Sequence, residues 1–233
     1  MVTSKNLAGL KPEVVIFDLD GTMLNSQPLI NDCLRMMVRD MFGPERAAQL
    51  TDASMQKYLG PPLMFSMQDI NPQGTEADWD AMIARFRGYF LPRANESDLF
   101  AGIPQTLETL RKRGYRLAVG TSKMETAAID VLTHHGVADF FETIGGAASD
   151  LGRSTKAEVL HEVLRRVGLS EHPERALMIG DRFYDAEGAA KWGIPCILAT
   201  WNKPLDPGED EKAVGVVGST DELLALLPGR NQD

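Results

Sequence analysis

The sequence predicts an α/β protein: a Rossmann-like, mainly parallel sheet with helices on both faces, plus a small all-α domain inserted after the first strand. Three observations lead to this prediction. Short β-branched apolar runs alternate with segments of helical periodicity, glycines follow the helical segments, and one long stretch has no strand pattern. With 233 residues, 43% of them hydrophobic, the chain is long enough to bury a substantial core.

Five short apolar runs are the expected strands. The first, with the sequence VVIF, is rich in β-branched residues, ends at Asp18 and is too short for a helix. Strands that alternate with helices form right-handed βαβ units, so these strands should run parallel in a sheet covered on both faces. The expected strands are residues 14–17, 116–119, 140–144, 176–179 and 194–198.

Between these runs, apolar residues recur at intervals of three and four positions, which is typical of amphipathic helices. A glycine follows four of these segments, as expected at the C-terminal end of a helix. The composition of residues 202–212, NKPLDPGEDEK, indicates an exposed loop. The expected helices of the core are residues 103–112, 124–134, 155–167, 185–191 and 221–227.

The stretch from residue 25 to residue 95 interrupts this alternation. It is rich in methionine, has helical patches at 29–41 and 77–89, and has no strand pattern. An insertion after the C-terminal end of a strand lies above the sheet edge where α/β proteins bind ligands, which favours a lid over a merely stabilising appendage. The predicted domains are a discontinuous core, residues 1–24 and 96–233, and a helical cap, residues 25–95.

Composition excludes several classes of function. There are 33 acidic against 24 basic residues, and the formal charge of −9 argues against a nucleic acid polymer as partner. Cys33 and Cys196 form neither a disulfide framework nor a zinc motif. No apolar run approaches the length of a membrane span, about 20 residues, and residues 1–13 lack the apolar stretch of a signal peptide. We therefore expect a cytoplasmic protein with reduced cysteines and no membrane partner; the sequence predicts no oligomeric state.

Acidic residues follow two of the expected strands. Asp18 and Asp20 come after the first strand, and Asp181 and Asp185 come after the fourth. Because parallel strands bring their C-terminal ends to one edge, these carboxylates should meet there. Neighbouring carboxylates repel each other unless a cation or a shared proton lies between them, and an all-oxygen set favours a hard cation such as Mg²⁺. The alternative role for Asp181 and Asp185 is to cap the helix that follows.

Four segments resemble, in order, the four motifs of the haloacid dehalogenase-like (HAD) hydrolase superfamily. Residues 18–26, DLDGTMLNS, are similar to the first motif, and residues 180–189, GDRFYDAEGA, to the fourth. Residues 117–123, LAVGTSK, place a hydroxyl at the end of a strand, as in the second motif. Residues 153–156, RSTK, supply a lysine at the start of a helix, as in the third. The resemblance spans residues 14–200, with a helical insertion between the first two motifs.

The resemblance implies how the acidic residues would act. Asp18 would attack phosphorus and form an aspartyl-phosphate, since a carboxyl group with an ordinary pKa of about 3.9 is ionised at neutral pH and needs no base. Asp20 would protonate the leaving oxygen and then deprotonate water, so its surroundings should favour the protonated acid. Asp18, the main-chain carbonyl of Asp20 and Asp181 would hold Mg²⁺, and Asp185 would lie behind them and orient a ligand or a water.

The second and third motifs imply a phosphate site. Thr121 and Ser122 would bind phosphoryl oxygens, together with backbone N–H groups at the start of the next helix. Lys156 would pair with both the nucleophile and the phosphate as a point charge. Helix capping is the alternative for Thr121, and a solvated surface charge is the alternative for Lys156. Arg153 lies close enough in sequence to compete with Lys156 for the role.

Single residues discriminate among the chemistries of this superfamily. Dehalogenases and the carbon–phosphorus-cleaving members lack the second aspartate, which is present here as Asp20. GTSK at 120–123 and YLGPPL at 58–63 resemble the phosphoglycolate phosphatase-like branch. We therefore expect a Mg²⁺-dependent phosphatase that hydrolyses the phosphate monoester of a small metabolite, such as phosphoglycolate. The alternatives are a nucleotidase acting on nucleoside monophosphates, a phosphosugar mutase, and a catalytically silent binding protein on the same fold.

Overall fold

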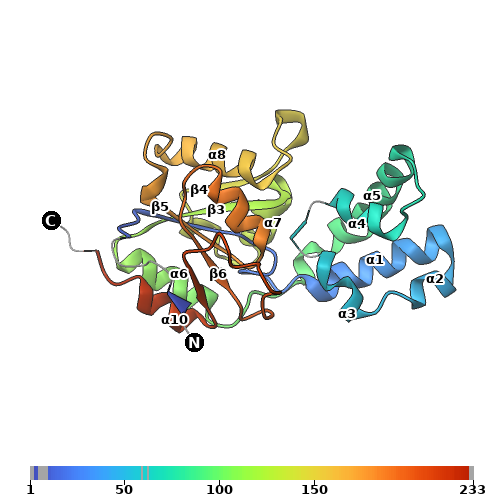
Figure 1. Ribbon diagram of the computed structural model, residues 1–233, viewed down its shortest axis with the longest axis horizontal. Helices are drawn as coiled ribbons and strands as arrows, with labels where there is room; N and C mark the ends of the chain where they lie inside the picture. Colours follow the sequence, from blue (N-terminus) through green and yellow to red (C-terminus); the bar gives the residue numbers. More distant parts are fainter. Residues whose placement is uncertain (1–2, 5–9, 59, 62, 231–233) are drawn as a thin grey trace. The chain divides into compact units, whose positions relative to one another are not determined.

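The computed structural model describes residues 3–4, 10–58, 60–61 and 63–230 (Figure 1). It divides the chain into two compact units. The α/β unit comprises Met1–Leu24 and Leu99–Asp233, and the helical unit is Asn25–Asp98. Each unit is described by itself below.

Within the described residues, the α/β unit contains one sheet in the order β1-β7-β6-β5-β2-β3-β4. All neighbouring strands are parallel except β1, which pairs antiparallel with β7. The predicted Rossmann-like, mainly parallel sheet is therefore confirmed. The strands are β1 (Thr3–Ser4), β2 (Val14–Phe17), β3 (Arg116–Met124), β4 (Thr143–Ala147), β5 (Ala176–Gly180), β6 (Cys196–Ala199) and β7 (Gly215–Val217).

The two strands that lead to the acidic residues lie side by side at the centre of the sheet. β2 pairs with β5 in the register Val14↔Ala176 to Phe17↔Ile179. Every residue of both strands is buried, which explains why both read as continuous apolar runs. Since the two strands end level with each other, the residues that follow them emerge at the same sheet edge.

Helices cover both faces of this sheet (Figure 1). One core cluster joins Val14 and Ile16 of β2 to the apolar sides of α8 and α9. α6 and α10 lie together on the other face. The helices are α6 (Ile103–Lys112), α7 (Glu125–His134), α8 (Lys156–Val167), α9 (Phe183–Ala190) and α10 (Thr220–Leu226), with short 3₁₀ turns η3 (Ala138–Phe140), η4 (Ser149–Leu151) and η5 (Pro173–Arg175).

Several element boundaries differ from the predicted ones. β3 runs on to Met124, with a register shift against β4 beyond Gly120, so the expected end at 119 is too early. β4 begins at Thr143 instead of 140, because the preceding residues form a 3₁₀ turn. α9 begins at Phe183 instead of 185, because the Asp185 carboxylate accepts backbone N–H bonds and caps the helix start.

The helical unit contains no strand among its described residues and has a methionine-rich core. Met37, Met55, Met67 and Met82 are all fully buried in it. Flexible methionines fill the irregular spaces between short helices. Leu59 and Pro62, which belong to the motif at 58–63, lie outside the described residues. The elements are α1 (Gln27–Phe42), α2 (Pro44–Ala48), α3 (Asp52–Met55), α4 (Leu63–Ile70) and α5 (Glu76–Phe90), with 3₁₀ turns η1 (Gln56–Tyr58) and η2 (Leu91–Glu96).

Two expectations from composition concern the whole chain. Cys33 and Cys196 are both buried and unbridged. In the part of the chain that the structure describes, every helix is too short or too polar to cross a membrane.

Candidate active site

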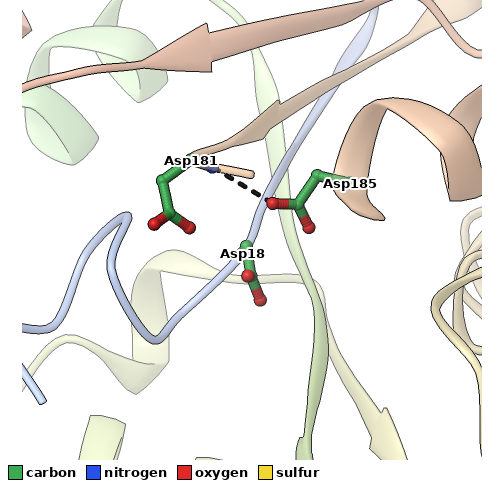
Figure 2. A group of neighbouring side chains, drawn as sticks. All are labelled: Asp18, Asp181 and Asp185. Carbon is green, nitrogen blue, oxygen red and sulfur yellow. Dashed lines mark hydrogen bonds between the residues drawn. The ribbon is translucent and has the colours of Figure 1, made fainter. Parts of the chain in front are cut away.

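Three carboxylates meet at the C-terminal ends of β2 and β5 (Figure 2). Asp18 follows β2, Asp181 follows β5, and Asp185 lies in the first turn of α9. One oxygen of each lies within 4.8 Å of one oxygen of the others. Their exposed fractions are 5%, 2% and 2%, so water screens the mutual repulsion poorly. We call Asp18, Asp181 and Asp185 the acidic cluster.

The loop after β2 approaches the cluster closely because it contains a glycine. Gly21 has φ +85°, a left-handed conformation that favours glycine. A Cβ atom at this position would lie only 2.3 Å from Oδ2 of Asp181. Thr22, the next residue, donates a hydrogen bond of 3.4 Å from Oγ1 to Oδ1 of Asp181. The motif sequence Gly-Thr thus brings the first strand's loop against the fourth motif's aspartate.

Asp185 is anchored to the backbone at the start of α9. Its Oδ2 accepts hydrogen bonds from the N–H groups of Asp181 and Arg182, both 3.1 Å long. Gly180 permits this arrangement, because a Cβ there would lie 2.3 Å from the Asp185 side chain. The capping role weighed for Asp185 therefore occurs, and it is combined with membership of the acidic cluster.

Lys156 is a cation in direct contact with the acidic cluster. Its Nζ lies 2.9 Å from Oδ1 of Asp18 and 2.7 Å from Oδ1 of Asp185, and it donates to the Gly120 carbonyl at 3.0 Å. Thr155 caps α8, which makes Lys156 the first residue of that helix. Lys156 is buried, so the alternative of a solvated surface charge is wrong.

The cluster holds more negative charge than Lys156 can balance. Burial raises the pKa of Asp18 to about 6, although the Lys156 ammonium opposes this shift. Burial and the charges of Asp185 and Asp18 raise the pKa of Asp181 well above its ordinary value. Within the described chain, Oδ2 of Asp181 is buried and has no hydrogen-bond partner. A divalent cation fits this site, because it would neutralise the excess charge and give Asp181 a partner.

Asp20 lies apart from the cluster and pairs with a lysine. Both of its carboxylate oxygens lie 2.9 Å from Nζ of Lys123. The side chains of Lys123 and Asp20 are 5% and 18% exposed. The ammonium group of Lys123 therefore lies against the residue that we expect to act as the proton donor.

The expected phosphate-binding residues lie at the end of β3. Thr121 is buried, and its Oγ1 accepts a hydrogen bond of 3.2 Å from the N–H of Lys123. Ser122 is half-buried. Thr121 lies near the end of β3, and β3 pairs with β2, the strand that leads to Asp18. This places the hydroxyl at the same sheet edge as the acidic cluster.

Comparison with known proteins identifies the family. Residues 15–199 match the model described as haloacid dehalogenase-like hydrolase. The chain belongs to this family. The prediction of a HAD-like hydrolase is therefore confirmed.

Named relatives of this HAD-like hydrolase carry different functions. The tyrosine-protein kinase PtkA of Mycobacterium tuberculosis is 36% identical over 222 residues, which are 94% of this chain and 74% of that protein. A 5′-nucleotidase of Pseudomonas aeruginosa is 30% identical over 95% of this chain and 91% of its own length. Phosphoglycolate phosphatases are also among the relatives, at 26 to 28% identity. A crystal structure described as a predicted phosphatase from Clostridium acetobutylicum has a TM-score of 0.81 at 30% identity, covering 91% of this chain and 96% of its own.

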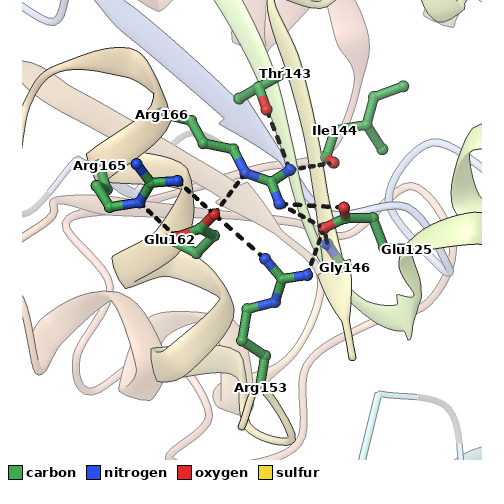
Figure 3. Close-up of polar contacts among 8 residues, drawn as sticks. All are labelled: Glu125, Thr143, Ile144, Gly146, Arg153, Glu162, Arg165 and Arg166. Atoms are coloured by element: carbon green, nitrogen blue, oxygen red, sulfur yellow. Dashed lines mark hydrogen bonds and ion pairs between the residues drawn. The ribbon is translucent and has the colours of Figure 1, made fainter. Parts of the chain in front are cut away.

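In this HAD-like hydrolase, Arg153 does not take the place of Lys156. It pairs with Glu125 at 3.1 Å and with Glu162 at 3.4 Å, and both glutamates also pair with Arg166 (Figure 3). Hydrogen bonds from Arg165 and Arg166 lower the pKa of Glu162 to about 2. These ion pairs link the start of α7 to α8, beside the strand end that carries Thr121.

Two contacts near the site could not be predicted from any motif or periodicity in the sequence. Trp201 donates from Nε1 to the carbonyl of Thr22 at 2.9 Å. Arg182, next to Asp181, pairs with Glu209 at 2.7 Å, and both side chains are largely buried. The loop at 202–212 was expected to be exposed, yet part of it packs against the residue that follows Asp181.

Proposed function

We propose that this chain is a Mg²⁺-dependent phosphatase that hydrolyses small phosphate monoesters through an aspartyl-phosphate on Asp18. The observation that carries the proposal is the acidic cluster itself: three buried carboxylates, one facing lysine and an unpartnered oxygen on Asp181. The phosphatase names among the relatives support the same reaction class.

The ligand set that we propose for the metal follows from which oxygens are already used. Both oxygens of Asp185 face protein groups, the backbone N–H groups on one side and Lys156 on the other. Asp18 and Asp181 would therefore hold Mg²⁺ with the main-chain carbonyl of Asp20, and Asp185 would orient them. When bound, Mg²⁺ would reduce the repulsion between the carboxylates and the phosphoryl oxygens.

The residues divide the reaction between them. The Asp18 carboxylate attacks phosphorus, the ester P–O bond breaks, and Asp20 gives its proton to the leaving oxygen. Water then attacks the aspartyl-phosphate, Asp20 takes the water's proton, and Asp18 is released with inorganic phosphate. Lys156, held beside Asp18, supplies positive charge to the phosphoryl group, and Thr121 with Ser122 donates hydrogen bonds to it.

Hydrolysis of a generic aryl phosphate should require Mg²⁺. We expect release of the coloured phenol with Mg²⁺, loss of the reaction in excess chelator, and recovery when Mg²⁺ is restored. Asp181→Asn should not regain hydrolysis when Mg²⁺ is restored, because the variant lacks one anionic ligand. The control is Asp130→Asn, which changes an exposed aspartate on α7 and should hydrolyse the ester as wild type does. Turnover that persists in excess chelator would contradict the metal requirement, and no turnover of any phosphate ester would favour the silent binding protein.

The substrate class can be resolved with a panel of phosphorylated metabolites. Phosphoglycolate and nucleoside monophosphates are the two leading candidates, because proteins named for both activities are relatives of this chain. A phosphosugar that is isomerised without release of phosphate would identify a mutase. The small metabolite as partner and the cytoplasmic location remain predictions from the sequence.

A second candidate function is phosphoryl transfer to protein tyrosine. It rests on the 36% identity to PtkA, of which this chain covers 74%. The same aspartate would then pass a phosphoryl group to a tyrosine hydroxyl instead of water. Incubation with γ-labelled ATP and a tyrosine-containing protein distinguishes the two functions, since a phosphatase leaves the protein unlabelled.

A further inference from the structure

The Lys123–Asp20 pair is the second lysine–carboxylate contact of the site, and it is separate from the first. Lys156 pairs with Asp18 and Asp185. Lys123 pairs with both oxygens of Asp20 at 2.9 Å. The two lysines therefore serve different carboxylates, one on the nucleophile's side and one on the proton donor's side.

The backbone around Asp20 is held in a tight turn. Gly21 donates its N–H to the Leu24 carbonyl, and Leu24 donates its N–H to the Leu19 carbonyl, at 2.9 and 2.8 Å. These bonds fix the main chain on both sides of Asp20. In the part of the chain that the structure describes, the hydrogen bonds to the carboxylate itself come from Lys123.

Lys123 is well placed to hold that carboxylate. It lies near the end of β3, two positions after Thr121, and β3 is hydrogen-bonded to β2, from which the Asp20 loop emerges. Its side chain is only 5% exposed. A lysine ammonium that leaves water this completely requires an anionic partner, and Asp20 supplies both of its oxygens. This contact is far less screened than a surface salt bridge.

We propose that Lys123 is a positioning residue that holds the Asp20 carboxyl group in place for proton transfer to the leaving oxygen. The inference rests on the proposed phosphatase function. As Asp18 attacks phosphorus, the ester P–O bond breaks and its electron pair stays on the leaving oxygen. That oxygen takes the proton from Asp20, which becomes a carboxylate. The ammonium of Lys123 stabilises this carboxylate more than the neutral acid before it, so the contact strengthens towards the transition state.

The leaving group provides the test. An alkyl alkoxide needs a proton as it departs, whereas 4-nitrophenolate is stable without one. In the kcat/KM ratio, only steps up to P–O cleavage count, so later hydrolysis of the aspartyl-phosphate does not interfere. We expect Lys123→Met to lower kcat/KM for an alkyl phosphate by roughly 100-fold, and for 4-nitrophenyl phosphate by a much smaller factor.

Three further variants make the test specific. In an Asp20→Asn background, Lys123→Met should cause little additional loss, because the group that it positions is already absent. Lys123→Arg keeps a cation beside Asp20 and should retain part of the alkyl phosphate activity. Lys112→Met removes an exposed lysine on α6 that pairs with Glu108 at the surface. This control variant should leave kcat/KM unchanged for both substrates. Thermal unfolding of every variant reports whether the fold is retained.

The outcomes separate the inference from the function on which it rests. If wild type hydrolyses both esters with Mg²⁺ but Lys123→Met lowers kcat/KM by the same factor for both, Lys123 binds the phosphate and the inference is wrong. The inference is also wrong if Lys123→Met lowers kcat/KM for the alkyl phosphate by as large a factor in the Asp20→Asn background as in wild type. If Lys123→Met does not fold, the selective loss must be seen in Lys123→Arg, and an equal loss there overturns the inference. Wild type without any phosphatase activity would refute the function and the inference together.

Discussion

Asp18→Asn should lose phosphatase activity by roughly 10⁵-fold while the protein stays folded. The amide cannot form an aspartyl-phosphate, and removing a nucleophile costs about this much in other enzymes that use covalent catalysis. The variant should also be more stable than wild type when no metal is present. Burial raises the pKa of Asp18 from 3.8 to about 6, so the folded state prefers the uncharged group.

The sign of that stability effect follows from linkage. An acid whose pKa is higher in the folded protein destabilises the fold once it ionises. For Asp18 this cost develops between pH 4 and 6 and is complete above pH 6. The gain from Asp18→Asn should therefore be present at pH 8 and shrink towards pH 4, measured by urea unfolding in chelator. Asp130→Asn, exposed on α7, is the matched control and should change neither activity nor stability. Comparable turnover by Asp18→Asn would remove Asp18 from its role.

Lys156→Met should have the largest effect on stability. Its ammonium pairs with Asp18 and Asp185 inside the protein, and breaking a buried ion pair by removing one partner typically costs about 3–5 kcal/mol. Burial alone would lower the pKa of Lys156, but the two carboxylates raise it, which shows how strongly they hold the charge. Activity should be lost as well, because the phosphoryl group loses its cation.

Mg²⁺ should restore part of the stability that Lys156→Met removes, because a divalent ion offsets the same carboxylates. Urea unfolding with and without Mg²⁺ measures both effects. Lys191→Met, at an exposed position after α9, is the control and should unfold as wild type does. An unchanged free energy of unfolding for Lys156→Met would show that the acidic cluster does not depend on this lysine.

The parts of the fold that could be predicted are those with a long or buried pattern. The helix at 103–112 and the strands at 14–17 and 176–179 follow from periodicity and continuous burial, and the structure has them within one residue. β7 and β1 were not predicted, because three and two residues are too few for a pattern to emerge. The start of α9 depends on a side-chain cap from Asp185, which no periodicity shows.

The site residues that could be predicted are the reactive side chains that come directly after a strand. Asp18 and Asp181 lie together because parallel strands end at one edge, and Lys156 reaches Asp18 from the first position of α8. The partner of Asp20 was not predictable, since a lysine in a strand is ordinarily on the surface and only the pairing of β3 with β2 brings Lys123 to it. The contact between Arg182 and the loop at 202–212 is equally invisible in a sequence, because it joins residues far apart that share no pattern.

The central claim is that Asp18 carries the phosphoryl group during turnover. The most direct measurement quenches the enzyme in acid while it turns over a phosphate monoester with Mg²⁺, and locates the phosphoryl group by mass spectrometry of its peptides. We predict one phosphoryl group on Asp18, removed by hydroxylamine as expected for an acyl phosphate and absent from Asp18→Asn. A phosphoryl group on any other residue, or rapid turnover in which the quenched enzyme never carries one, would contradict the account.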